Sequence, residues 1–492
     1  MREKEFLRQR YCAILSHTGT ILSLSSVLML SPLLAILAYP QEAKNFWSFV
    51  IPAVSLGLLG LFLWRFFRAS LSSPLTTQEG GVIVVISWIV VILFSAWPIA
   101  EALNMDFSRA IFESVSGWTT TGLSVVDVTT AGPMILLWRS TMQLAGGAGL
   151  AIIMMSAIVG PTGVGISTAE GRRDQLVPQV RESARLVLII YSGYALVGVL
   201  AYRLAGMDLF DAVNQSFAAV STGGFSTRVE SIGYWDSVAV EAVTLPLMLL
   251  GNLSFVSAWL LLQGDLRSFF RNGEVRLMAV MIPLSIAALF IFTSSRLYPL
   301  FGKSLRVAVF ETVTALTTTG FSTVSYDKWD PLGVLMLMVL MLIGGGTCST
   351  AGGIKQFRVY TLWKLMIWEI RRPFMPRKAV MIRPLWEGNR QVFVEDARAR
   401  QIGVFVFLYL ATFLAGAMIL CACGYSIRDS LFEFASAIGT VGLSIGVTSA
   451  HMHDAALWAE TTAMFLGRLE FIVVIISILK MAKDTRIILK PT

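Results

Sequence analysis

The chain has 492 residues, of which 55% are hydrophobic and only 14% are charged, and its mean hydropathy is +0.70. A composition this apolar excludes an ordinary soluble globular protein and predicts a chain embedded in lipid. The net charge of +8 does not indicate nucleic-acid binding, because the basic residues lie in short tracts between apolar stretches. We therefore expect a multi-pass membrane protein that contacts lipid and no nucleic acid.

About ten apolar stretches reach the roughly 20 residues that a spanning helix requires. They centre on residues 14–38, 47–67, 82–102, 133–160, 184–205, 238–264, 275–297, 333–370, 402–424 and 455–480. The first follows a basic segment but has no small-residue cleavage site, so it predicts an uncleaved helix rather than a signal peptide. Shorter helical pieces lie between the third and fourth, fifth and sixth, seventh and eighth, and ninth and tenth stretches. These pieces are too short to cross a bilayer, and we interpret them as re-entrant segments.

Basic residues gather on one side of this layout. They are Arg2, Lys4, Arg8 and Arg10, then Arg172, Arg173, Arg181 and Arg185, then Arg267, Arg271 and Arg276, and finally the segments Lys355 to Arg400 and Lys480 to Lys490. Short loops rich in Lys and Arg remain in the cytoplasm. The pattern therefore predicts cytoplasmic N- and C-termini, with the short pieces entering from the outside.

Acidic residues follow the first three short pieces on the outer side. They are Asp127, Glu230, Asp236, Asp327 and Asp330. Taken one at a time, such acids are best interpreted as solvated loop charges. Their recurrence favours an acidic mouth that concentrates cations by focusing the electric field.

One motif occurs four times: Glu or Gln, six residues, Thr, one residue, Gly, Leu or Phe, then Ser. The copies are Glu113 to Ser124, Gln215 to Ser226, Glu311 to Ser322 and Glu433 to Ser444. At average residue usage the Thr, Gly and Ser positions predict only about 0.15 copies in a chain of this length. A single membrane glycine is best explained by helix packing, but four copies, one for each pair of apolar stretches, indicate a shared function.

Cation transport gives these positions a chemical reason. A dehydrated cation needs a ring of backbone carbonyls, and backbone turned toward a common axis needs residues without a Cβ clash. The short helix before each copy would also point its negative end at the ion. The predicted ion-contacting residues are Thr120, Thr121, Gly122, Thr222, Gly223, Gly224, Thr318, Thr319, Gly320, Thr440, Val441 and Gly442. The fourth copy comes close to the Thr-Val-Gly-Tyr core of potassium-channel filters.

Two further features lie in the eighth and last stretches. The run from Gly344 to Lys355 cannot remain a continuous helix, so it predicts a flexible loop inside the membrane. We interpret its glycines, Gly344, Gly345, Gly346, Gly352 and Gly353, as a gate below the filter. A phosphate-binding loop is the competing interpretation, but no strand precedes the run and its spacing differs.

Arg468 lies near the middle of the last apolar stretch, in the sequence Gly467-Arg468-Leu469-Glu470. An ionisable residue at membrane depth is a functional candidate by default, and here its charge would oppose cation passage. A structural ion pair with Glu460 or Glu470, or a side chain that reaches the interface, is the alternative.

Cysteine chemistry and bound cofactors are not expected. Cys12, Cys348, Cys421 and Cys423 show neither paired extracellular spacing nor a metal-binding cluster with the three histidines. We therefore predict neither disulfides nor structural zinc. The sequence has no nucleophile–base pair or carboxylate dyad at membrane depth, so we also predict that the protein is not an enzyme.

Together the four motif copies, the glycine-rich loop and the Arg468 motif resemble the Trk/Ktr/HKT superfamily of potassium transporters, and most closely its TrkH-type bacterial subunits. The likeness covers nearly the whole chain. It implies an all-α integral membrane fold of four pseudo-repeated helix/pore-helix/helix units around a central pore, after two extra N-terminal helices. The implied division is 1–75 for those helices, 76–165 for the first pore repeat, 166–266 for the second, 267–375 for the third with a broken second helix, and 376–492 for a basic cytoplasmic loop and the fourth.

The resemblance also implies potassium uptake across the inner membrane, with potassium as the substrate, rubidium as its surrogate and no cofactor. Gly122, Gly224, Gly320 and Gly442 would line the potassium site. The loop and Arg468 would restrict the path beneath it. Sodium-preferring members often carry serine at the position of Gly122. Relatives also often have smaller residues where this loop has Thr347 and Cys348.

A homodimer with one pore per subunit, regulated by a cytosolic TrkA-type nucleotide-binding ring, is the expected assembly. The segment from Lys355 to Arg400 is one candidate for the docking surface of the ring. A potassium-binding subunit of a P-type pump is the alternative function, and it would need an ATP-hydrolysing partner. Channel-like conduction and coupling to protons or sodium both remain open at this point.

Overall fold

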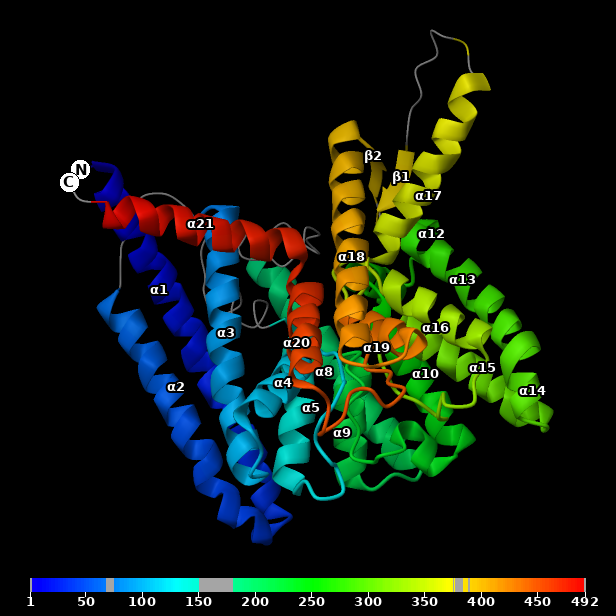
Figure 1. The fold of residues 1–492 in the computed structure, drawn as a ribbon, viewed down its shortest axis with the longest axis horizontal. Coiled ribbons are helices and arrows are strands. Elements are labelled where there is room, and N and C mark those ends of the chain that lie inside the picture. Colours follow the sequence, from blue (N-terminus) through cyan, green and yellow to red (C-terminus); the bar gives the residue numbers. More distant parts are fainter. Residues whose placement is uncertain are drawn as a thin grey trace.

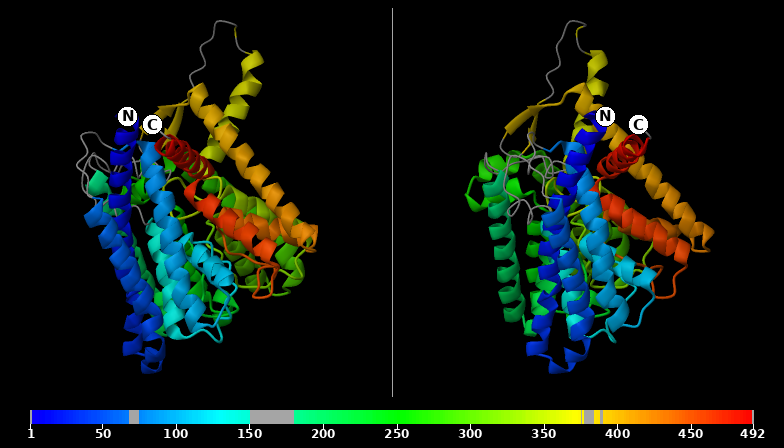
Figure 2. Two further views of the ribbon diagram at one scale, coloured as in Figure 1. Left: turned by 60° about the vertical axis from the view of Figure 1, so that its left-hand side comes forward. Right: turned by 90° about the vertical axis from the view of Figure 1, so that its left-hand side faces the viewer.

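The computed structural model describes residues 2–67, 75–149, 180–374, 376, 384–387 and 390–490. These residues are predominantly helical, and most of the long helices run side by side (Figures 1 and 2). Within the described ranges, six helices are long and apolar enough to cross a membrane, or up to eight if each of two bent helix pairs is one span. This is the multi-pass helical architecture that the composition predicts.

The N-terminal helices form a tightly packed hairpin. Helix α1 (Arg2–Met29) is joined to α2 (Phe46–Phe66) by two 3-10 turns, η1 (Ser31–Leu37) and η2 (Pro40–Asn45). A Cβ on Gly19 of α1 would lie 2.5 Å from the carbonyl oxygen of Gly60 on α2, so the contact requires a residue without a side chain.

Helix α3 (Thr77–Ala102) begins at a reciprocal cap. The Thr76 side chain accepts a hydrogen bond from the Glu79 amide, and the Glu79 carboxylate accepts one from the Thr76 amide. Glu79 is also paired with Arg10 of α1, whose Nε lies 2.7 Å from Oε1. This buried pair ties the hairpin to the rest of the molecule.

The four gaps predicted to hold short helices contain α4 (Phe107–Trp118), α9 (Leu209–Val220), α15 (Phe301–Leu316) and α19 (Ile427–Gly439). They have 12 to 16 residues, about 18–24 Å at the rise of an α-helix, which is less than the thickness of the hydrocarbon core. Asp106, Asp208 and Ser426 cap α4, α9 and α19. Each helix leads into one of the four motif copies.

Longer helices flank these four. They are α5 (Pro133–Ala148), α8 (Val180–Leu204), α10 (Val238–Asn252) with α11 (Phe255–Leu262), α12 (Leu266–Arg271), α13 (Gly273–Leu289) continued by η4 (Phe290–Ser294) and α14 (Ser295–Leu297), α16 (Pro331–Ile343), α17 (Gln356–Arg371), α18 (Asp396–Ala422), α20 (Asp454–Leu469) and α21 (Phe471–Leu489). Short 3-10 turns η3 (Ser231–Trp235) and η5 (Arg372–Phe374) complete the helical elements. The second half of the predicted fourth stretch, the residues Arg172 and Arg173 and the boundary at 165/166 lie outside the described residues.

Three features differ from a simple series of spans. The sixth and tenth predicted stretches each consist of two helices, bent by 117° between α10 and α11 and by 98° between α20 and α21. The first bend follows the extended backbone of Leu253 and the Ser254 cap, and the second follows Glu470 at φ +63°. Strands β1 (Pro384–Glu387) and β2 (Arg390–Phe393) form an antiparallel hairpin beside α17, with Leu385 opposite Val392 (Figure 1). The sequence patterns predict neither of the two bends and neither of the two strands.

Candidate ion-binding site

The four motif copies form a closed ring in which each segment contacts the next. A Cβ on the glycine of any motif copy would overlap a carbonyl oxygen of the next segment. The pairs are Gly122 with Gly223, Gly224 with Thr319, Gly320 with Val441, and Gly442 with Thr121. The fourth segment therefore contacts the first, and only glycine permits this approach at each position. The structure brings all four segments together at one place.

The backbone conformation is also the same in all four segments. In each, the Thr and the Gly two residues later have positive φ. The values are 55° for Thr120 and 93° for Gly122, 51° for Thr222 and 73° for Gly224, 52° for Thr318 and 82° for Gly320, and 49° for Thr440 and 98° for Gly442. A left-handed threonine costs about 1–2 kcal/mol, so four of them at equivalent positions indicate a functional constraint.

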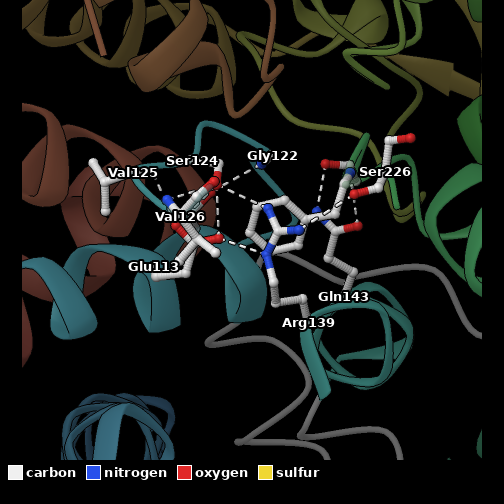
Figure 3. Close-up of polar contacts among 11 residues, drawn as sticks. Glu113, Gly122, Ser124, Val125, Val126, Arg139, Gln143 and Ser226 are labelled. Carbon is white, nitrogen blue, oxygen red and sulfur yellow. Dashed lines mark hydrogen bonds and ion pairs between the residues drawn. The ribbon is translucent and has the colours of Figure 1, made fainter. Parts of the chain in front are cut away.

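A buried ion pair supports the first segment (Figure 3). Glu113 on α4 accepts hydrogen bonds from Arg139 Nε at 2.6 Å, from Ser124 Oγ at 3.0 Å and from the Val125 amide at 3.0 Å. Arg139 on α5 also donates to Ser124 and to the Ser226 carbonyl, at 2.8 and 3.3 Å. It therefore joins the first segment to the second.

The first residue of every motif copy has the same task. Gln215 donates to Ser226 Oγ at 2.7 Å, Glu433 accepts from Ser444 Oγ at 2.6 Å, and Glu311 accepts from Thr323 Oγ1 at 2.8 Å. In the third copy the partner is thus one residue beyond the Ser of the motif. These side chains hold the backbone that leaves the ring, which explains why the motif begins with Glu or Gln.

Sequence reasoning missed two residues at this site. Arg139 is buried beside Glu113, and Gln143, one turn later on α5, accepts a hydrogen bond from the Phe225 amide at 3.1 Å and donates to the Gly223 carbonyl. An arginine within an apolar stretch is itself a signal of function, and it could have directed attention to this helix.

Two threonine hydroxyls in the ring are unused. Thr120 Oγ1 and Thr440 Oγ1 are buried and have no hydrogen-bond partner within the described part of the chain. Buried hydroxyls normally find a partner, so these two oxygens are available to a bound cation. Thr222 and Thr318 differ, because their hydroxyls contact the glycine-rich loop.

A cavity of about 790 Å³ opens on one side of the ring, the side predicted to face outward, and is lined by Gly122, Gly224, Gly320 and Gly442. The predicted acids Asp127, Glu230 and Asp327 also line it, together with Arg139 and Arg228, which are paired with Glu113 and Asp211. Hydrogen bonds from the Thr129 side chain and amide lower the pKa of Asp127, so its carboxylate stays charged.

Two of the predicted acids have other roles. Asp236 is paired with Lys303, at 2.5 Å, and with Arg306, and the hydrogen bond from Lys303 lowers its pKa. Asp330 caps α16 by accepting hydrogen bonds from the amides of Leu332 and Gly333. Neither residue lines the cavity.

The glycine-rich loop lies directly against the ring and does not line the cavity. The Gly352 amide donates to Thr318 Oγ1 at 2.7 Å, and the hydroxyls of Thr350 and Thr222 are 3.0 Å apart. A Cβ on Gly352 would overlap Gly439 and Thr440, so the loop reaches the third, second and fourth segments.

The loop is a compact hydrogen-bonded turn. The Gly345 amide donates to the Gly352 carbonyl at 3.0 Å, and the Gly346 amide donates to the Asn252 carbonyl at 3.1 Å. Gly344 and Gly353, both with positive φ, pack against one another. The expected break in the helix is therefore present between α16 and α17, with defined contacts on both sides.

Arg468, on the last turn of α20, donates hydrogen bonds to the carbonyl of Thr350 in the loop and to those of Gly146 and Gly147 at the end of α5. Glu470 forms its ion pair with Arg358, at 2.7 Å, and Glu460 accepts a hydrogen bond from Thr448 at 3.0 Å. The guanidinium therefore lies at the loop.

Lys355, which the sequence analysis names only as the end of the glycine-rich run and the start of the basic segment, is a second basic residue at the loop. It donates to the Ala351 carbonyl, next to the carbonyl that Arg468 contacts. Two positive side chains thus hold consecutive carbonyls beneath the ring.

Apolar helices long enough to span a bilayer, together with a ring of close backbone contacts between a cavity and a loop that carries basic side chains, define a multi-pass membrane protein of the transporter class. A sequence profile of the TrkH family, described as a cation transport protein, matches residues 48–488. The chain belongs to this family, and the resemblance drawn from its motifs is confirmed.

Proteins of similar sequence or structure align with nearly the whole chain. The Trk system potassium uptake protein TrkG of Escherichia coli (strain K12) is 32% identical over 473 residues, covering 93% of this chain and 96% of that protein. The Trk system potassium uptake protein TrkH of Halomonas elongata is 30% identical over 482 residues, covering 94% and 97%. The crystal structure of the potassium transporter TrkH from Vibrio parahaemolyticus superposes with a TM-score of 0.82 at 26% identity, covering 98% and 99%.

Proposed function

We propose that this protein takes up potassium across the inner membrane through a pore formed by four helix/pore-helix/helix units. The ring of four glycine contacts is the observation that carries the proposal. Potassium binding requires several oxygens around one axis, and the ring supplies backbone carbonyls together with the free hydroxyls of Thr120 and Thr440. The relatives named as potassium uptake proteins support the choice of ion.

Electrostatics favour a cation at this position. Helices α4, α9, α15 and α19 all end where the ring begins, so the negative ends of four helix dipoles face it. The acidic residues of the outer cavity raise the local concentration of cations before they enter. Glycine at position 122, rather than serine, is consistent with potassium over sodium.

The loop and Arg468 form the gate in this proposal. The loop touches three of the four segments from the inner side, and Arg468 and Lys355 place positive charge beneath them. A potassium ion leaving the ring would meet this charge and the loop backbone. Opening then requires the loop and Arg468 to move away from the axis.

The assembly is a homodimer regulated by a TrkA-type nucleotide-binding ring, with both termini in the cytoplasm. Lys4 contacts the Lys490 carbonyl, so the two ends of the chain lie together on the side of the basic tracts (Figure 1). The β1–β2 hairpin and α17 extend from that same side, and the hydrophobic cluster of Phe357, Leu385 and Val394 holds them together. This projection offers a docking surface for the ring.

Rubidium uptake by the full chain, together with its cytosolic partner, in cells that lack potassium uptake tests the proposal. Wild type should restore growth at low potassium and take up rubidium. Gly320→Ala should abolish both, because the new Cβ would overlap Val441. Gly193→Ala is the matched control, since no atom lies within 4 Å of its Cβ position. Absence of rubidium influx in a correctly inserted preparation with its partner would disprove the proposal.

A further inference from the structure

The last helix, α21, lies across the neighbouring helices rather than along them (Figures 1 and 2). It leaves α20 at 98°. Ser477 packs against Gly81 in the second turn of α3, Tyr11 in the third turn of α1 donates to Asp484 at 3.1 Å, and Lys4 contacts the Lys490 carbonyl. Because α1 and α3 are spans, a helix that crosses both in their N-terminal turns lies near the membrane surface.

The face of α21 that points away from these contacts has two halves. Ile475, Ile476 and Leu479 are 42%, 41% and 64% exposed. Lys483 and Arg486 follow on the same face at helical spacing, and both are exposed. We call these five residues the apolar–basic face.

The charge of this face is not neutralised within the protein. Asp484 points inward and is paired with Lys480 at 2.8 Å. Among the described residues Lys483 and Arg486 form no ion pair. On α1, exposed Arg8 is accompanied by exposed Glu3 and Glu5, so the basic excess comes from α21.

Apolar side chains followed by free basic ones on a surface-lying helix fit the boundary between acyl chains and anionic headgroups. A second copy of this chain fits less well, because the apolar–basic face contains no acidic residue that could neutralise Lys483 and Arg486 across a two-fold contact. The complementary occupant is an acidic phospholipid.

We propose that the apolar–basic face of α21 binds acidic phospholipid of the cytoplasmic leaflet, and that this binding sets the position of Arg468. The joint between the two is short. Glu470, the residue before α21, has φ +63° and pairs with Arg358 at 2.7 Å, while Arg468 two residues earlier contacts the loop. A displacement of α21 is therefore transmitted to the loop across a single hinge residue. This second step rests on the proposed role of Arg468 in gating.

Lipid binding is measured as the thermal stabilisation of purified full-length protein by added phosphatidylglycerol, with phosphatidylcholine as the neutral comparison. Each basic residue near an anionic surface strengthens binding about fivefold, so the double variant K483Q/R486Q should raise the half-maximal lipid concentration roughly 25-fold. Both side chains are exposed, so folding should be preserved. The matched control R267Q/R371Q removes two exposed charges elsewhere and should leave the concentration unchanged.

Equal stabilisation by both lipids, or equal loss in both double variants, would overturn the binding proposal. A change in oligomeric state of K483Q/R486Q without lipid dependence would also overturn it, because the face would then be a contact between copies. A shift confined to K483Q/R486Q supports it.

Gating is measured as rubidium flux in liposomes of phosphatidylcholine with and without 30% phosphatidylglycerol. We expect the acidic lipid to change wild-type flux at least threefold, with no change in K483Q/R486Q. A flux that is unaffected by lipid in a protein that binds it would disprove the coupling. No flux in either lipid would instead count against potassium transport, while the binding result would stand.

Discussion

The glycine ring and the loop beneath it are both irregular backbone inside the protein, yet they are held in different ways. Each ring segment is supported by a buried side chain of its own short helix, such as Glu113, Gln215 or Glu433. The loop is held by backbone contacts and by side chains from other parts of the chain. The buried Glu274 accepts hydrogen bonds from the Thr347 amide and hydroxyl, and Arg468 donates to the Thr350 carbonyl. The ring is therefore supported from within its own motif copies, whereas the loop depends on residues distant in sequence.

The largest effect is expected when a buried side chain that supports the ring is removed. Glu113→Ala leaves Arg139 buried without its carboxylate and should destabilise the protein by about 3–5 kcal/mol. Thermal unfolding followed by size-exclusion chromatography would report the loss. The double variant E113Q/R139Q should recover most of the stability, because Gln215 performs the same support in the second copy without charge. An equally unstable double variant would show that the charges themselves are needed.

The loop should respond in the opposite direction. Arg468→Ala removes charge-assisted hydrogen bonds worth about 1.5–3 kcal/mol each, so the protein should lose some stability while rubidium flux rises roughly tenfold or more. Deleting part of the segment from Gly344 to Gly353 should also raise flux. Arg468→Lys, which keeps the charge, serves as control and should stay near wild type. Lower flux in both altered proteins would reverse the assignment of the gate.

A third prediction concerns the selectivity of the ring for potassium over sodium. Gly122→Ser adds a side chain where φ is +93° and where a Cβ would overlap the Gly223 carbonyl. The overlap should remove most of the uptake, and in the uptake that remains the ratio of potassium to sodium permeation should fall roughly tenfold, equivalent to about 1.4 kcal/mol. Competition between the two ions for rubidium uptake measures it. Gly193→Ser is the control, and unchanged selectivity in Gly122→Ser would place Gly122 off the ion path.

The smallest effect concerns the outer cavity. Asp127→Asn should lower rubidium uptake about twofold at low ionic strength and have no effect at high salt, because exposed charges are screened. The pKa of Asp127 is lowered, so its contribution is complete above the ordinary aspartate range of about 4 and disappears only below it. Asp454→Asn is the matched control, since that exposed acid is paired with Arg109 and does not line the cavity. Equal effects of both variants would argue against focusing by the cavity.

Sequence predicts the parts of this molecule that repeat. Apolar length predicts the membrane fold, and the recurrence of Thr, Gly and Ser identifies the segments that meet in the ring. It does not predict that Arg139 pairs with Glu113, or that Asp330 is a cap rather than a wall of the cavity. Those roles depend on which helices pack against one another, and local sequence patterns do not determine that packing.

The bend between α20 and α21 also depends on a contact between segments that are distant in sequence. The stretch from 455 to 480 is apolar throughout most of its length, so periodicity alone favours one span. The turn at Glu470 is fixed by its carboxylate on Arg358, a residue 112 positions earlier in the chain. The β1–β2 hairpin likewise depends on Leu385 and Val394 packing against Phe357 of α17.

The ring closes through a contact between Gly442 and the segment of Gly122, and this has a consequence for biogenesis. Synthesis proceeds from the N-terminus, so three segments are already made when the fourth is still in the ribosome. The ring has no closing contact until that last quarter is inserted beside the first. If the ring is the ion path, as proposed, a chain truncated before α19 should fail to conduct rubidium, which an uptake assay on the truncated protein would test.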